Sequence, residues 1–109
     1  MDDKSLYSGL IRLHILHHSA EESFYGIWIA EELAHHGYKL SAGTLYPILH
    51  GLENKGYLRS HLERNGKSGR RVYRITPLGR KALRAARKRV RELFGEMFEG
   101  SSEKTSKSV

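Results

Sequence analysis

Apolar residues recur every three or four positions in three stretches of the first half of the chain, as they do on the inner face of a helix. This spacing predicts helices over residues 4–18, 24–36 and 42–55. Residues suited to N-caps precede each stretch, and glycines suited to a left-handed helix stop follow the second and third. The caps are Asp2 or Asp3, Ser23 and Ser41, and the glycines are Gly37 and Gly56.

The spacing of apolar residues changes from helical to alternating after Gly56. Residues 57–63 and 70–75 are predicted to be strands. Between them, Asn65-Gly66 is a strong turn signal because both positions tolerate positive φ. Thr76 followed by Pro77 marks the start of a last helix, which is predicted from residue 77 to about 98. The polar residues 99–109 are expected to form a disordered tail.

This order of elements predicts a mostly α fold with a small β-hairpin. A helix, a three-residue turn, a second helix and then a hairpin with a basic tip is the order of a winged helix-turn-helix. We therefore expect such a domain over residues 1–76 and a separate C-terminal helix over residues 77–98.

Composition narrows the class of protein. A length of 109 residues fits one domain, and the formal charge is +7. Residues 55–91 contain fourteen basic residues and one acidic residue, which favours a nucleic-acid partner, although basic helices can be merely solvated. The absence of Cys excludes disulfides, thiolate nucleophiles and Cys-ligated zinc. No apolar stretch is long enough to span a bilayer, and the acidic start Asp2-Asp3 is unlike a signal peptide, so we expect a cytoplasmic protein.

The outer face of the third predicted helix suits the DNA major groove, where residues near a helix N-terminus reach base edges. Pro47 would clash with the carbonyl of Gly43, four residues earlier, so we expect a bend in this helix and not a break. A capped helix with a polar outside and no DNA contact is the alternative interpretation. The face carries small or hydrogen-bonding residues and no acidic one, namely Gly43, Thr44, Tyr46, Pro47, His50 and Asn54.

The predicted hairpin has a basic tip. Gly66 and Gly69 give this tip conformational freedom. Cationic side chains on such a hairpin would follow backbone phosphates or enter the minor groove. A solvated hairpin end is the alternative. The tip residues in question are Lys67, Ser68, Arg70 and Arg71.

Several sequence blocks resemble the PadR family of transcriptional regulators, over roughly residues 5–95. The resemblance is carried by Phe24-Tyr25-Gly26-Ile27, Leu40-Ser41-Ala42-Gly43-Thr44-Leu45-Tyr46-Pro47-Ile48-Leu49, Leu52-Glu53, Gly56-Tyr57-Leu58 and Arg70-Arg71-Val72-Tyr73-Arg74-Ile75-Thr76-Pro77-Leu78-Gly79.

The resemblance implies a winged-helix homodimer of the short subgroup with a single C-terminal helix, usually a repressor that a ligand or another signal releases. It assigns DNA contacts to the third helix and to the hairpin, here called the wing. The candidate DNA-binding residues are Tyr25, Ser41, Gly43, Thr44, Tyr46, Pro47, His50, Lys67, Ser68, Arg70 and Arg71.

The last predicted helix independently favours a dimer. Its apolar residues alternate at three and four positions, as in a short heptad seam, and its basic residues Arg80, Arg84, Arg87, Lys88 and Arg91 are expected on the opposite side. One domain cannot bury this seam as well as a first helix that is apolar on two sides, so a second copy is expected to cover both. A seam that caps its own core is the alternative. The candidate interface residues are Leu6, Leu10, Leu83, Ala86, Val90, Leu93, Phe94 and Met97.

The remaining candidate chemistry is sparse. His14 and His18 lie one helical turn apart and can ligate a metal, but zinc needs a third or fourth ligand that the sequence does not identify. No metal site, cofactor or catalytic set is therefore assigned, and an enzyme is not expected. Trp28 is interpreted either as surface packing or as a ligand or dimer contact.

The function expected is that of a sequence-specific DNA-binding regulator, acting as a homodimeric repressor on a near-palindromic operator. Two alternatives stay open. A winged-helix protein-interaction module would not need the basic block, and a non-specific architectural nucleic-acid binder would not prefer one operator.

Overall fold

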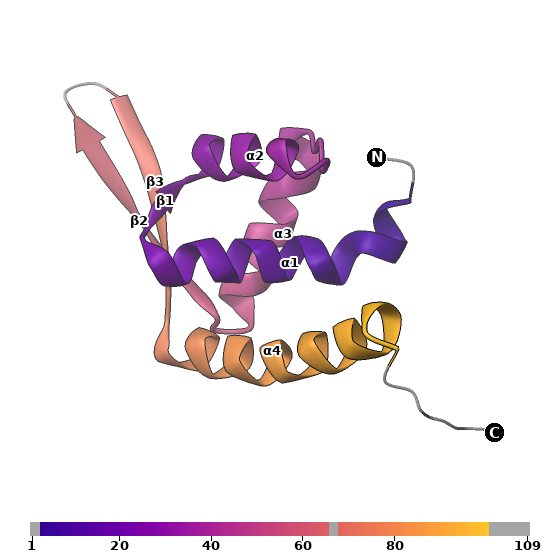
Figure 1. Cartoon of the computed structure of the whole chain (residues 1–109). Coiled ribbons are helices and arrows are strands. Elements are labelled where there is room, and N and C mark those ends of the chain that lie inside the picture. The colour runs from indigo at the N-terminus through magenta and orange to yellow at the C-terminus, as the bar shows by residue number, and fades with distance from the viewer. Residues whose placement is uncertain (1–2, 66–67, 101–109) are drawn as a thin grey trace.

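The computed structural model describes residues 3–65 and 68–100 (Figure 1). Along these residues the chain forms α1 (Lys4–Glu21), β1 (Phe24–Tyr25), α2 (Gly26–His35), α3 (Ala42–Asn54), β2 (Leu58–Asn65), β3 (Ser68–Ile75) and α4 (Pro77–Phe98). The predicted fold class, mostly α with a small hairpin, is confirmed. None of these helices is long and apolar enough to cross a membrane. The expected disordered tail lies outside the described residues, apart from Glu99 and Gly100.

The strands form one antiparallel sheet in the order β1-β3-β2. In the wing, Leu58 pairs with Ile75 at the base and Asn65 pairs with Ser68 near the tip. Both strands are longer than the sequence predicts. The wing therefore projects well away from the helices, as Figure 1 shows at the upper left.

The core is formed where the first three helices meet the sheet. On the inner faces of α2 and α3, Ile29, Leu33, Leu45, Leu49 and Leu52 are all buried. On α1 the buried face consists of Ile11, Ile15 and Leu16, whereas Leu6 and Leu10 stay 67% and 45% exposed. Helix α1 is thus apolar on two sides, and only one of them faces this chain's core.

The second helix begins later than its sequence pattern predicts. Phe24 and Tyr25 form strand β1, paired with Tyr73 and Val72 of β3, and α2 starts at Gly26. Tyr25 is the N-cap residue, so the prediction of Ser23 as the cap is wrong. The physical reason is tertiary. The Phe24 ring is buried and stacks on the Tyr73 ring with centroids 5.8 Å apart, which holds this segment extended.

The other helix ends follow local rules with small shifts. The Asp3 carboxylate accepts a hydrogen bond from the amide of Leu6, so this cap is confirmed. Helix α1 continues to Glu21, beyond the predicted residue 18. In this extension the buried Ser19 hydroxyl is satisfied, because it donates to the Leu16 carbonyl at 2.9 Å. Gly37 and Gly56 adopt φ of 92° and 82°, as their roles as helix stops require.

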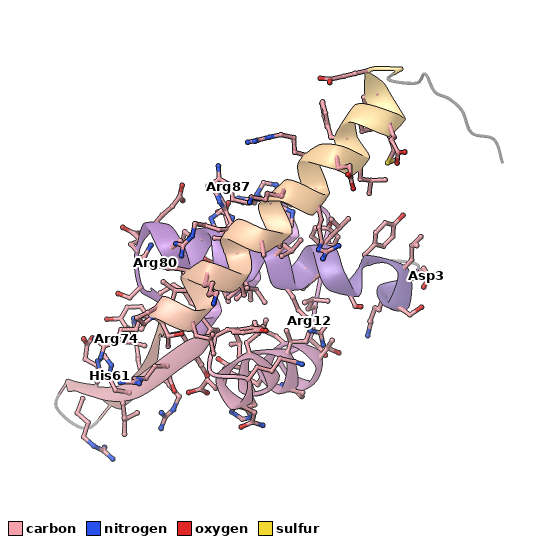
Figure 2. The ribbon with its side chains drawn as sticks, turned by 90° about the horizontal axis from the view of Figure 1, so that it is seen from below. Asp3, Arg12, His61, Arg74, Arg80 and Arg87 are labelled. Carbon is pink, nitrogen blue, oxygen red and sulfur yellow. The ribbon has the colours of Figure 1, made fainter. Side chains whose placement is uncertain are left out.

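Helix α4 starts from a tight joint against the turn between α3 and β2. Thr76 is its N-cap, as predicted, and accepts from the Gly79 amide at 2.9 Å. The Thr76 amide donates to the Tyr57 carbonyl at 3.0 Å. A β-carbon on Gly79 would collide with that same carbonyl oxygen, so only glycine fits here. From this joint α4 runs antiparallel to α1 and crosses it, as Figure 2 shows from below.

Candidate nucleic-acid interface

Helix α3 presents a polar outer face beside a buried inner one. Leu45 and Leu49 are buried on its inner side, while Gly43, Pro47 and His50 are exposed on the other. The helix passes through Pro47 without a break, as expected. Its N-terminal half is therefore open to a ligand approaching from outside.

The N-terminus of α3 carries a small polar network. Ser41 occupies the N-cap position, but its side chain makes no capping hydrogen bond to the helix backbone. Its hydroxyl lies 3.3 Å from the Thr44 hydroxyl, to which it donates. The ammonium group of Lys4, on α1, donates to the same Thr44 oxygen at 3.4 Å. Lys4 thus adds a positive charge to the positive end of the helix dipole.

Lys4 is a residue that the sequence analysis missed. It lies 40 positions before Thr44, and nothing in the local pattern links the two. Only the fold brings the start of α1 beside the start of α3. Together they concentrate positive potential where an anion would approach.

Tyr46 lies across the beginning of α2. Tyr46 is 38% exposed, and its hydroxyl would stand 2.5 Å from a β-carbon on Gly26. Gly26 is buried, so the absence of a side chain there makes room for the tyrosine. The orientation of Tyr46 on the outer face of α3 therefore depends on glycine at the start of α2.

Tyr25 connects β1 to the wing. Its hydroxyl donates to Glu63 Oε1 of β2 at 2.5 Å, and Arg70 of β3 lies over its ring at 5.2 Å from the centroid. Glu63 and Arg70 are themselves cross-strand partners. The hydrogen bond to Glu63 raises the pKa of Tyr25, with the charge of Glu63 adding to the effect. The tyrosine thus stays a neutral donor that holds the wing at the pair formed by Glu63 and Arg70, in the half nearer the tip.

Arg71 is held differently from Arg70. Its guanidinium donates to the Ser60 hydroxyl at 3.1 Å, and Ser60 in turn donates to Glu53 of α3 at 2.6 Å. Successive residues of a strand point to opposite faces, so the two arginines face different sides of β3. Lys67 lies outside the described residues, and so does the side chain of Ser68.

A second feature is an apolar groove between α1 and α4, with a volume of about 540 Å³. Beyond it, the end of α4 projects with Leu93 54% and Phe98 69% exposed. The rings of Phe94 and Phe98 contact each other at 5.0 Å between centroids. The groove is lined by Leu10, Leu13, His14, His17, Leu83, Ala86, Arg87, Val90, Arg91 and Phe94.

Two details of the groove differ from the expected seam. Leu83 is only 8% exposed and belongs to this chain's own core, so it forms the floor of the groove. Arg87 and Arg91, expected on the side opposite the seam, line the groove beside Val90. Figure 2 shows Arg80 and Arg87 leaving α4 on the same side. Helical spacing alone therefore does not separate a basic side of α4 from an apolar one, because both kinds of residue line the groove.

Comparison with known proteins identifies the family of this chain. The model of the PadR-like family of transcriptional regulators matches residues 15–85. The chain belongs to the PadR-like family. The resemblance noted from its sequence is thereby confirmed, and this family consists of transcriptional regulators and not of enzymes.

Individual relatives of the PadR-like family are similar to this chain in sequence or in fold. The chain is 49% identical over 92 residues to the transcriptional regulator Rv3488 of Mycobacterium tuberculosis, covering 84% of this chain and 86% of that protein. A PadR-family regulator from Eggerthella lenta is 29% identical, with a TM-score of 0.77 over 92% of this chain and 88% of its own. The Bacillus subtilis PadR in complex with operator DNA shares the fold, at 19% identity and a TM-score of 0.63, covering 70% of this chain and 45% of that one.

Proposed function

We propose that this PadR-like regulator is a sequence-specific DNA-binding repressor that acts as a homodimer. The observation that carries the proposal is the exposed N-terminal half of α3. It offers Gly43, Thr44 and Tyr46 without a carboxylate, next to the ammonium group of Lys4. The complex of the Bacillus subtilis PadR with operator DNA supports a DNA ligand for this fold.

In this proposal α3 is the recognition helix. Its first turns enter the major groove, where a glycine allows close approach and hydroxyls can bond to base edges. Ser41 and the open amides at the start of α3 bind phosphate, because a helix N-terminus attracts anions. The site residues are those expected from the sequence, with Lys4 added.

The wing supplies the contacts that do not depend on sequence. Arg70, Arg71 and Lys67 are candidates for binding phosphates or the minor groove beside the recognition helix. Tyr25 holds the half of the wing nearer its tip through Glu63 and Arg70, and so has a positioning role in addition to any contact of its own.

The dimer in this proposal is formed by the groove and the projecting end of α4. An isolated chain would leave Leu6, Leu93, Met97 and Phe98 in water, each more than half exposed. A second copy related by a two-fold axis would place its own α4 against this groove and cover both sets of residues. The same two-fold symmetry would place two recognition helices about 34 Å apart, which is the spacing that a near-palindromic operator requires. The regulator would act in the cytoplasm.

The proposal is tested by selecting bound sequences from a random DNA pool with the full-length protein. Enrichment of a near-palindrome is expected, with an affinity about 10³-fold or more above random duplex at moderate salt. A reporter whose promoter overlaps the selected site should then be silenced. Equal affinity for all sequences would favour an architectural binder, and no DNA binding would favour a protein-interaction module; either result overturns the proposal.

A further inference from the structure

Four side chains that offer metal-binding atoms converge where α1 packs against the end of α2. His14 and His18 come from α1, Glu32 comes from α2, and His36 is the residue that caps α2. One nitrogen from each of the three histidines lies within 4.8 Å of the others. The imidazole rings of His14 and His36 stack with centroids 4.7 Å apart.

The Glu32 carboxylate lies beside this group, close to two of its three histidines. Its Oε2 atom lies 3.2 Å from Nε2 of His36 and 3.6 Å from Nε2 of His18. Zinc binds imidazole nitrogen and carboxylate oxygen at about 2.0–2.2 Å, so two ligand atoms of a tetrahedral site lie about 3.3–3.5 Å apart. The two Glu32 distances are close to this edge, and the histidine nitrogens, which lie within 4.8 Å of one another, would move closer together around an ion.

The environment of His18 independently points to a missing ligand. Its Nε2 atom is shielded from solvent and has no hydrogen-bond partner among the described residues. At 3.6 Å the Glu32 oxygen is too far to be one. Buried polar atoms are nearly always satisfied, and an unsatisfied one calls for an explanation. A cation between His18 and Glu32 would supply it.

Aromatic rings close the site on two sides. The Trp28 ring meets His18 edge-on with centroids 5.7 Å apart, and the Tyr38 ring lies 5.4 Å from that of His14. Two of the four side chains are thus flanked by aromatic rings.

We propose that His14, His18, Glu32 and His36 form a binding site for a divalent transition-metal ion of the zinc class. Three imidazoles and one carboxylate suit zinc, cobalt or nickel, whereas magnesium and calcium prefer all-oxygen sites. A second group, His17, His18 and Glu21, is less suitable because His17 and Glu21 are 56% and 63% exposed and all three residues lie on one helix.

A metal ion in this site would join α1 to the C-terminal end of α2. Helix α1 also lines the groove and carries Lys4, while α2 is packed against Tyr46 at its other end. The ion would thus stiffen the connection between the proposed dimer region and the DNA-reading part. Only this last consequence rests on the proposed function; metal binding itself does not.

Direct titration of the tag-free, full-length protein with Co²⁺ and then Zn²⁺ tests the site. Co²⁺ should bind at one ion per chain, produce visible absorption bands and quench the fluorescence of Trp28, which is the single tryptophan and contacts His18. Zn²⁺ should remove the bands by displacement. The variants His36→Gln and Glu32→Gln should weaken binding by at least about 10–100-fold, since even indirect support of a metal ligand is worth that much.

Two matched controls identify the site. His35→Gln removes a neighbouring exposed histidine, and Glu21→Gln removes the carboxylate of the second group; both should bind like the unaltered chain. Helix content measured by circular dichroism in EDTA checks that each variant is folded. Failure of the unaltered chain to bind either ion, or unchanged affinity in both His36→Gln and Glu32→Gln, would overturn the proposal.

Discussion

The ring of Tyr46 lies against Gly26, with its hydroxyl 2.5 Å from the place a β-carbon would take. This contact joins the outer face of α3 to the first turn of α2. A methyl group at Gly26 would meet the far end of a half-exposed side chain, which can swing away at little cost. The start of α2 therefore controls the direction of a proposed DNA-reading residue.

Gly26→Ala should displace the Tyr46 ring and leave the fold intact. Operator affinity is expected to fall by about tenfold or more, which corresponds to one lost base contact, and is measured by fluorescence anisotropy. Gly51→Ala is the matched control, because nothing lies within 4 Å of a β-carbon there. Equal operator affinity in the two variants would refute the link between Gly26 and Tyr46.

Combining Tyr46→Ala with Thr44→Ala should impair operator binding directly. Both side chains lie outside the buried core, so the thermal unfolding curve should shift little. The affinity for the selected operator is expected to approach that for random DNA. A folded double variant with unchanged operator affinity would mean that α3 does not read the bases.

Removing the wing charges at Lys67, Arg70 and Arg71 should weaken binding to specific and random DNA alike. Phosphate contacts release counterions, so the slope of log K against log salt should fall by about 0.9 per lost contact. Arg71→Ala alone should also lower stability slightly, because Arg71 donates to the Ser60 hydroxyl, which would keep only its bond to Glu53. A salt slope unchanged in the triple variant would place the wing away from DNA.

The unaltered chain should have twice its 12.5 kDa chain mass in light scattering. Val90→Asp combined with Leu93→Asp puts carboxylates into the proposed apolar interface, at a cost of several kcal/mol unless they are paired or protonated. The double variant should be monomeric and lose tight operator binding. Arg91 at the groove rim can offset part of this cost, so the pair of substitutions is needed.

Lys88→Asp provides the charge control for the dimer prediction. Lys88 is exposed on α4 and does not line the groove, so this variant should stay dimeric. A monomeric unaltered chain, or a dimeric double variant with normal DNA binding, would contradict the proposed interface.

Gly79→Ala should destabilise the fold far more than Gly26→Ala or Gly51→Ala. Its β-carbon would collide with the backbone oxygen of Tyr57, and backbone cannot move aside as a side-chain tip can. We expect a loss of about 2–3 kcal/mol in the free energy of unfolding, or about 10 °C in Tm. Thermal melts should show Gly51→Ala equal to or above the unaltered chain, because alanine favours a helix interior.

The local features of this fold could be predicted from the sequence. Asp3, Thr76, Gly37 and Gly56 act through their nearest neighbours, so helix ends followed from the residue types. The outer face of α3 followed from helical spacing in the same way. Strand β1 could not be predicted, because its pairing partner Tyr73 lies far along the chain and two residues carry no periodicity.

The relationships between helices could not be predicted from the sequence either. His14 and His18, and likewise Glu32 and His36, are each spaced by one helical turn, which is visible in the sequence. The contact between the two pairs depends on how α1 packs against α2, and the spacing of residues along the sequence does not contain that information. The placement of Lys4 beside Thr44 depends on tertiary packing for the same reason.

The close packing at Gly79 fixes the N-terminus of α4 rigidly to the rest of the domain. No space is left between Gly79 and the Tyr57 carbonyl, and the 22 residues of α4 extend about 33 Å from this point. A tilt of about 5° at the joint would move the far end by roughly 3 Å, a distance comparable to the rise of one DNA base pair. If two copies are joined at the far ends of their α4 helices, a conformational change too small to disturb either core is enough to shift the two α3 helices out of register with the DNA.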